Sequence, residues 1–370
     1  MRKIALPLVL STYAALGTSY ADVPSVAVDI APVHSLVSQV MGTLSEPTLI
    51  VSAGASPHGY SLRPSEAQAL QDANLVFWVS AGLTPWLEET VVTLAPDATR
   101  IELLELEGIT ALALREGALF EAHQHDHHEH GDEHHDEAQH DEAHHDDEHH
   151  EEAQDDHEHD DEEHHDEAHH DHEHHVEAHH DDEHDHHNSK EQASEAHHEH
   201  GEHDAHAWLD PSIAILWLDA IATELAKADP ENADTYKRNA ATAKAELEQL
   251  KADVQQILAP VSGRSFIVFH DAYQYFENAY DFPSSGAISL SDASRPSPAR
   301  IQQIQDRVAQ ADVTCVLAEP QFNPDLVRTV LDGTNAQSSV VDPLGSNLET
   351  GPTLYTKLVR ELAQTLADCV

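Results

Sequence analysis

The sequence has few of the basic side chains with which proteins bind nucleic acids or anionic membranes. Only 18 of its 370 residues are Lys or Arg, against 69 Asp and Glu, and the formal net charge is −51 at pH 7. Nucleic acids and anionic membranes are bound through clustered Lys and Arg. The composition therefore argues against both as partners.

Long hydrophobic runs are also missing, with one exception at the N-terminus. Residues 4–16 form an apolar run that follows Arg2 and Lys3 and is too short to span a bilayer. Small residues at 19–21 suit a signal peptidase, so we expect residues 1–21 to be a signal peptide cleaved after Ala21. The alternative is a membrane anchor. No cysteine follows the run, so we expect a soluble exported protein without a lipid anchor.

Cysteine is scarce as well. Cys315 and Cys369 are the only two. An even number of cysteines in an exported protein favours a disulfide, and closing so long a loop would contribute about 3–4 kcal/mol. Zinc ligation by the pair is the competing interpretation, but two isolated cysteines this far apart lack the spacing of a metal site.

Histidine is concentrated in one acidic segment. Between His123 and His206 lie 31 of the 34 histidines, and residues 121–206 hold 35 of the 69 acidic residues but one basic residue. Apolar side chains other than alanine are almost absent there, so we expect a disordered loop over 118–204. Imidazoles among carboxylates are typical of weak zinc, copper, nickel or cobalt sites. The alternative is a solvated, pH-responsive spacer.

The rest of the chain alternates between short β-rich runs and helical patterns, which predicts an α/β fold with parallel sheets. Four predicted strands precede the histidine segment: 26–30, 48–52, 74–80 and 100–106. Four more follow residue 263: 265–269, 287–290, 313–318 and 339–341. Helices are expected at 33–41, from 63 and from 84, and then at 272–279, 297–311, 323–331 and 353–367.

One long helix is predicted between these two blocks, over residues 230–258. Apolar residues from Tyr236 to Ile257 recur at alternating spacings of four and three, which indicates one buried face. At about 1.5 Å per residue the helix would be about 40 Å long, which suits a rigid connector between two lobes. A coiled-coil dimer is the alternative, but the apolar stripe is short and contains alanines.

Four residues form a candidate metal site. His58 lies in a loop of small residues after a strand, His206 follows the acidic segment, and His270 ends the predicted strand 265–269. Asp342 follows the last predicted strand. Open α/β sheets bind ligands at the carboxyl ends of their strands, and three imidazoles with one carboxylate can make a tetrahedral zinc site. Of the other histidines, His34 is expected to be structural.

At these residues the sequence closely resembles the cluster A-I metal-binding proteins of ABC transporters, and among them the high-affinity zinc-binding members. The matching segments are GASPHGYSLRP (54–64), HAWLDP (206–211), FHDAYQYF (269–276) and DPLGSN (342–347). They appear in the expected order over nearly the whole mature chain, and a histidine-rich acidic loop between the first two is typical of the zinc members.

The resemblance implies two (β/α)4-type lobes that hold Zn(II) between them. The N-terminal lobe would span 22–228, the linking helix 229–262 and the C-terminal lobe 263–370, with His58 and His206 from the first lobe. Manganese-binding relatives carry a glutamate where His270 stands, so the histidine favours zinc. Some zinc members have a glutamate before the first histidine. Here that residue is Pro57, which leaves Asp342 or a water molecule as fourth ligand.

The resemblance also implies a monomeric periplasmic protein that delivers Zn(II) to an inner-membrane ABC permease with a cytoplasmic ATPase. Periplasmic zinc chaperones are further candidate partners, and the histidine-rich loop would hold additional, weakly bound Zn(II). One alternative is zinc storage or chaperoning without a transporter. The other is a zinc hydrolase, for which Glu319 and Asp271 are candidate bases but the HExxH pattern is absent. We therefore expect no enzymatic activity.

Overall fold

The computed structural model describes residues 23–120, 203–290, 296–310 and 313–370. The predicted signal peptide, 1–21, lies outside these ranges, as does all of the predicted 118–204 loop except 118–120 and 203–204. In the described ranges no helix is both long and apolar enough to cross a membrane.

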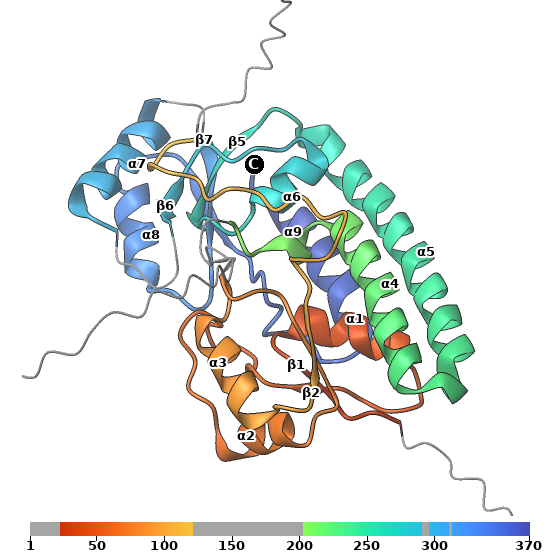
Figure 1. Ribbon diagram of the computed structural model, residues 1–370. Coiled ribbons are helices and arrows are strands. Elements are labelled where there is room, and N and C mark those ends of the chain that lie inside the picture. The colour runs from red at the N-terminus through yellow and green to blue at the C-terminus, as the bar shows by residue number, and fades with distance from the viewer. Residues whose placement is uncertain (1–22, 121–202, 291–295, 311–312) are drawn as a thin grey trace, which may run out of the picture. The chain divides into compact units, whose positions relative to one another are not determined.

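The first sheet has four parallel strands in the order β2-β1-β3-β4. Two of them, β1 and β2, are labelled in Figure 1. The strands are β1 (Val26–Val28), β2 (Thr48–Leu49), β3 (Leu75–Trp78) and β4 (Thr99–Glu102). They alternate with α1 (Ala31–Met41), α2 (Pro64–Gln71) and α3 (Pro85–Leu94). The predicted start of α2 is confirmed. Pro64 occupies its first turn, and the Glu66 carboxylate accepts a hydrogen bond from the backbone N–H of Arg63 at 2.7 Å.

The second sheet repeats this arrangement, in the order β6-β5-β7-β8, again all parallel. Its strands are β5 (Ser265–His270), β6 (Ala287–Ser289), β7 (Val313–Ala318) and β8 (Gln337–Val340). The helices are α6 (Gln274–Tyr280), α7 (Pro298–Gln310), α8 (Pro324–Leu331) and α9 (Leu354–Cys369). The prediction of an α/β fold with two four-stranded parallel sheets is therefore confirmed.

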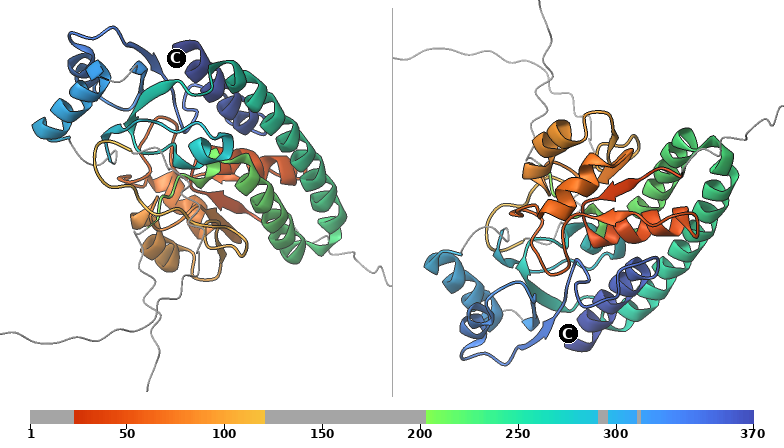
Figure 2. Two further views of the ribbon diagram at one scale, coloured as in Figure 1. Left: turned by 90° about the horizontal axis from the view of Figure 1, so that it is seen from above. Right: turned by 90° about the horizontal axis from the view of Figure 1, so that it is seen from below.

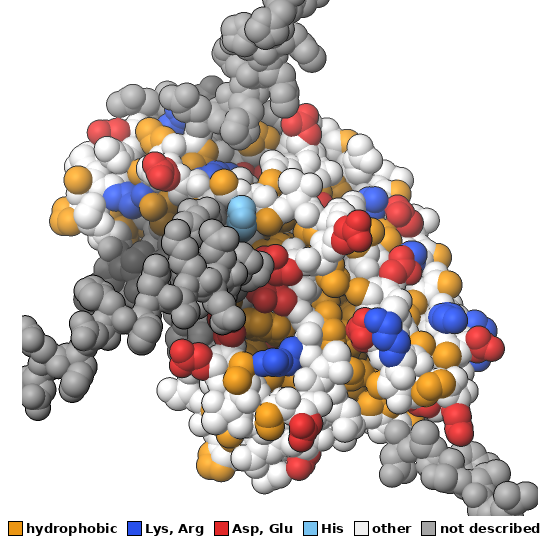
Figure 3. Space-filling view, in the orientation of Figure 1, with side chains coloured by type: hydrophobic (Ala, Val, Ile, Leu, Met, Phe, Trp, Pro, Cys, Tyr) orange, Lys and Arg blue, Asp and Glu red, His pale blue; other side chains and the backbone are white. Residues whose placement is uncertain are grey.

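Two helices lie between the sheets in chain order, α4 (Pro211–Ala228) and α5 (Ala233–Leu258). They pack along each other, as both views of Figure 2 show. The stripe predicted on α5 is buried from Tyr236 to Val254. Sequence analysis did not predict α4, although Asp210 caps it by accepting a hydrogen bond from the N–H of Ser212 and Pro211 opens its first turn. Basic and acidic side chains are intermixed over the outer face of the α4–α5 pair (Figure 3).

Both sheets contribute to one shared hydrophobic cluster, beside a separate cluster at each sheet. Val28 and Phe77 of the first sheet belong to the same buried cluster as Phe266 and Leu317 of the second. Helix α5 packs against α1 from the first half and against α9 from the second. Cys315 in β7 and Cys369 at the end of α9 form a disulfide, as predicted. Burial therefore continues from one half of the described chain to the other.

Candidate metal centre

A pocket collects loops from both halves of the chain, and three histidines line it. His58 comes from the loop after β2, His206 from the turn before α4, and His270 from the last position of β5. Glu319 and Phe322, which follow β7, complete one wall. The carboxyl ends of parallel strands thus supply much of the lining, as open α/β sheets predict.

The loop that carries His58 is fastened on both sides. The carbonyl oxygen of Pro57 accepts a 2.7 Å hydrogen bond from the indole nitrogen of Trp86, in α3. The hydroxyl of Tyr60 donates a 2.7 Å hydrogen bond to Glu66, in α2. His58 itself is half-buried. Its backbone is therefore held at the mouth of the pocket by the first two helices that follow it.

His206 is buried at the entrance to a single 3₁₀ turn, Ala207–Leu209. Its Nδ1 lies 2.7 Å from Oδ1 of Asp204, and its backbone N–H donates to the same oxygen at 2.9 Å. Two residues later, the indole nitrogen of Trp208 donates a 2.8 Å hydrogen bond to the carbonyl oxygen of Pro343. The segment with His206 is thus tied to the loop that follows β8.

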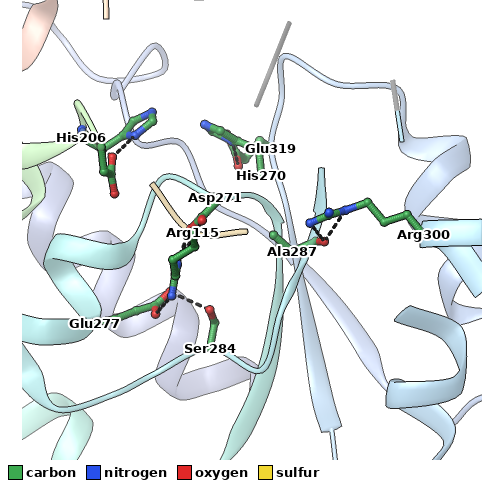
Figure 4. Close-up of polar contacts among 10 residues, drawn as sticks. Arg115, His206, His270, Asp271, Glu277, Ser284, Ala287, Arg300 and Glu319 are labelled. Atoms are coloured by element: carbon green, nitrogen blue, oxygen red, sulfur yellow. Dashed lines mark hydrogen bonds and ion pairs between the residues drawn. The ribbon is translucent and has the colours of Figure 1, made fainter. Parts of the chain in front are cut away.

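His270 is buried as well, and Glu319 lies beside it (Figure 4). Its Nδ1 is 2.6 Å from Oε1 of Glu319. Both carboxylates, Asp204 and Glu319, therefore face an imidazole Nδ1, and a metal ion would be bound through Nε2 of His206 and of His270.

The imidazole ring of His206 lies at similar distances from the other two rings, close to those of a zinc site. The ring centroids of His206 and His58 are 5.7 Å apart, and those of His206 and His270 are 5.4 Å apart. Around a tetrahedral zinc ion with Zn–N distances of about 2.0–2.1 Å, imidazole centroids are separated by roughly 5 Å. Across the residues described, no three His, Cys, Asp or Glu side chains yet have the geometry to hold a metal ion as they stand. Both measured ring pairs are thus slightly wider apart than around a bound zinc ion.

The structure does not place Asp342 among the side chains that line the histidine pocket, although the next two residues, Pro343 and Leu344, do line it. Its Oδ1 accepts hydrogen bonds from the Gln321 amide at 3.1 Å and from the N–H of Leu344 at 3.0 Å. Its Oδ2 accepts from the N–H of Ser346 at 2.6 Å and from the hydroxyl of the same residue. Both carboxylate oxygens thus hold the turn that follows β8.

Asp271 forms an ion pair with an arginine from the first half of the chain. Arg115 donates hydrogen bonds to both oxygens of Asp271 and a 2.6 Å bond to Glu277 (Figure 4). Its guanidinium lies over the ring of Phe120. Burial raises the pKa of Asp271, and Arg115 opposes this shift. Of the two candidate bases, Asp271 is thus bound to Arg115, and Glu319, which lines the pocket, is bound to His270.

The profile of one protein family, described as the zinc-uptake complex component A, periplasmic, ZnuA, matches residues 26–369. The chain belongs to the ZnuA family. It is 40% identical over 347 residues to the high-affinity zinc uptake system protein ZnuA of Brucella abortus (strain 2308), covering 93% of this chain and 91% of that protein. To the protein of the same name from Paracoccus denitrificans (strain Pd 1222) it is 37% identical over 369 residues, covering 98% of each.

Solved structures agree with this assignment at the level of the fold. A crystal structure of ZnuA superposes with a TM-score of 0.63 at 22% identity, over 94% of this chain and 99% of that one. ZnuA proteins are periplasmic zinc-binding components that work with an ABC permease and its ATPase, and the family is not one of enzymes. The resemblance stated from the four motifs is thereby confirmed.

In this ZnuA-family chain sequence reasoning missed three supporting side chains: Glu319, which lines the pocket, Asp204, which contacts His206, and Arg115, which contacts Asp271. Composition places Asp204 with the acidic segment, the sequence suggests Glu319 only as a base, and no pattern points to Arg115. A signal existed for the first two. Asp204 stands two residues before a candidate ligand, and Glu319 follows the buried strand β7 at the sheet edge that carries His270. The ion pairs of Arg115 join residues 156 and 162 positions apart, and no local pattern predicts them.

Proposed function

We propose that this protein captures Zn(II) in the periplasm and delivers it to an ABC-type zinc importer. The observation that carries the proposal is the gathering of His58, His206 and His270 around one pocket, in a chain of the ZnuA family. The relatives from Brucella and Paracoccus are named for high-affinity zinc uptake. A storage or chaperone role without a transporter is not favoured by these relatives.

The proposed ligands are the three histidines, with Asp342 or a water molecule in the fourth position. Nitrogen ligands favour zinc, whereas manganese prefers carboxylate-rich sites. To reach the ion, Asp342 would have to give up at least one hydrogen bond of the turn at 342–346. The Asp342 carboxylate would then gain a contact with zinc and lose a hydrogen bond that holds this turn.

We further propose that the metal is held between two lobes, 22–228 and 263–370, that the linking helix, 229–262, keeps at a nearly fixed separation. The core shared by both sheets supports this proposal, because a large hinge motion would break it. Loading and release of zinc would then depend on local changes in the loops around the pocket.

The segments outside the described residues complete the proposal. Residues 1–21 would be a cleavable signal peptide, and the mature protein would be a monomer without a lipid anchor. The histidine-rich segment, 118–204, would bind additional Zn(II) weakly and raise its concentration near the pocket. Zinc chaperones of the periplasm are further candidate partners of the protein.

The test is a competitive zinc titration of the mature protein beside a form that lacks residues 123–200. We expect the truncated form to keep one tight site and His270→Ala to lose it. His34→Ala is the matched control, because His34 is buried in α1 with its Nε2 on the carbonyl oxygen of Pro47. If truncation abolishes tight binding, the metal is held by the segment and a storage role replaces transport.

A further inference from the structure

Two buried carboxylates each hold one histidine of the pocket by the same ring nitrogen. Asp204 is 2% exposed and Glu319 is 5% exposed. Their oxygens lie 2.7 Å and 2.6 Å from Nδ1 of His206 and His270, respectively (Figure 4). An ionised carboxylate only accepts hydrogen bonds, so each Nδ1 carries the proton and each Nε2 carries the lone pair that a metal needs.

Asp204 is itself fixed by the second half of the chain. Its backbone carbonyl accepts a 2.9 Å hydrogen bond from the hydroxyl of Tyr275, in α6, and its N–H donates to Leu112 at 2.7 Å. In the amide orientation that satisfies its neighbours, Gln274 donates to the carbonyl oxygen of Ala113 at 3.1 Å and to Oδ2 of Asp204 at 3.2 Å. Helix α6 begins four residues after His270. The side chain that holds His206 is therefore held by the helix that follows His270.

We propose that Asp204 and Glu319 are positioning residues, which set the Nε2 atoms of His206 and His270 for zinc. This inference rests on the proposed function. A ligand imidazole whose second nitrogen is bound by a carboxylate keeps one tautomer and one ring orientation, and loss of such a partner lowers metal affinity by about 10- to 100-fold. Because α6 holds Asp204, this residue also fixes His206 relative to the half of the chain that carries His270.

The experiment compares substitutions of three kinds in the full mature chain. Asp204→Ala and Glu319→Ala remove the acceptor, and we expect each to lose about 10- to 100-fold in zinc affinity. Asp204→Asn and Glu319→Gln keep an oxygen that can accept from Nδ1, so they should recover part of this loss. Glu319→Asp keeps the charge but withdraws the oxygen by one methylene, so it too should bind zinc more weakly.

Affinity is measured by competition with a tight chelator, so that only the tight site is read out. The visible absorption of the Co(II)-loaded protein reports ligand number and geometry, and it should change for the alanine variants and for Glu319→Asp. Melting of the metal-free proteins separates folding from positioning. Asp229→Ala is the matched control. It removes a fully buried carboxylate that holds Tyr236 and Asn232 outside the pocket, so it should lower the melting temperature and leave the affinity unchanged.

Two results would overturn the inference while leaving the proposed function intact. One is wild-type affinity in the alanine variants and in Glu319→Asp, measured while His270→Ala loses tight binding. The other is an equal loss in the alanine and amide variants with an unchanged Co(II) spectrum. If His270→Ala binds zinc as tightly as the wild type, the proposed function fails instead. Should the alanine variants not fold, Glu319→Asp and the amide variants decide the question alone.

Discussion

The indole nitrogen of Trp208 donates a 2.8 Å hydrogen bond to the backbone carbonyl of Pro343. The first residue lies two positions after His206 and the second directly follows Asp342, so one hydrogen bond joins two of the segments that line the pocket. The hydroxyl of Tyr355, in α9, in turn donates to the carbonyl oxygen of Trp208 at 2.7 Å. Trp208 thus connects the segment that carries His206 with the loop after β8 and with helix α9.

Trp208→Phe is expected to destabilise the protein and to weaken zinc binding. The substitution leaves the Pro343 carbonyl without its donor in a buried place, which costs about 1–3 kcal/mol, and it frees the loop next to Asp342. Trp217→Phe is the matched control, because Trp217 is also fully buried but its indole nitrogen has no hydrogen-bond partner in the described structure. Denaturant unfolding and zinc titration of both variants check the prediction. Equal effects would show that only ring volume matters.

Arg115→Ala should be among the most destabilising single substitutions. It leaves the carboxylates of Asp271 and Glu277 buried without their positively charged partner. Breaking a buried ion pair in this way lowers the free energy of unfolding by about 3–5 kcal/mol. By contrast, Arg328→Ala removes an exposed pair with Asp325 and should cost no more than about 1 kcal/mol. Thermal melts of the two variants would contradict the prediction if they shift by similar amounts.

Removal of the disulfide should lower stability without removing the metal site. Cys315 and Cys369 are 54 residues apart in sequence. In the chain-entropy description a loop of this length gives about 4 kcal/mol. The double variant Cys315→Ala/Cys369→Ala should unfold at a lower denaturant concentration than the wild type. Reductant should lower the stability of the wild type but leave that of the double variant unchanged. Zinc affinity at low temperature should stay unchanged. An unfolding midpoint equal to that of the oxidised wild type would refute this.

Asp29 predicts a pH dependence of stability. It is fully buried, and burial raises its pKa from 3.8 to about 7, although the N–H groups of Ile30 and Val79 bond to it. Between about pH 4 and pH 7 the folded protein therefore binds a proton that the unfolded chain releases, and stability falls as pH rises through this window by at most about 1.4 kcal/mol per pH unit. Asp29→Asn should remove this slope. Urea unfolding at pH 5, 6 and 7 tests it, and parallel pH profiles for the two proteins would count against it.

The fold was largely predictable because its elements are locally encoded. Runs such as Ser265–His270 are apolar at almost every position, which suits a strand covered on both faces, and Pro64 marks the start of α2. Helix α4 was missed because its N-terminus follows the acidic segment directly, where composition hides the Asp210-Pro211 start signal. What sequence could not predict is the continuity of the core, since this depends on the packing of α5 against both α1 and α9.

The gathering of the three histidines was predictable, but the contacts that support them were not. A histidine at the end of a strand can be recognised by its position, and His58, His206 and His270 do line one pocket. Asp342 occupies the equivalent position after β8, yet its oxygens are bound in a local turn, because Ser346 and Leu344 offer N–H donors closer by. The position of a residue after a strand predicts where its backbone lies, but the neighbouring hydrogen-bond donors determine which groups its side chain contacts.

Gly286 allows the segment at 118–120 to lie directly against the second half of the chain. A Cβ atom at this position would come within 2.4 Å of the carbonyl oxygen of Ala118, and the N–H of Phe120 donates to Ser285. On the other side of the histidine-rich segment, His203 forms a β-bridge with Ala113. Both attachment points thus belong to the folded body. We therefore expect that residues can be removed between these two points, as in the form that lacks 123–200, without displacing the pocket, because the free energy of loop closure changes by only about 0.6 kcal/mol per doubling of length.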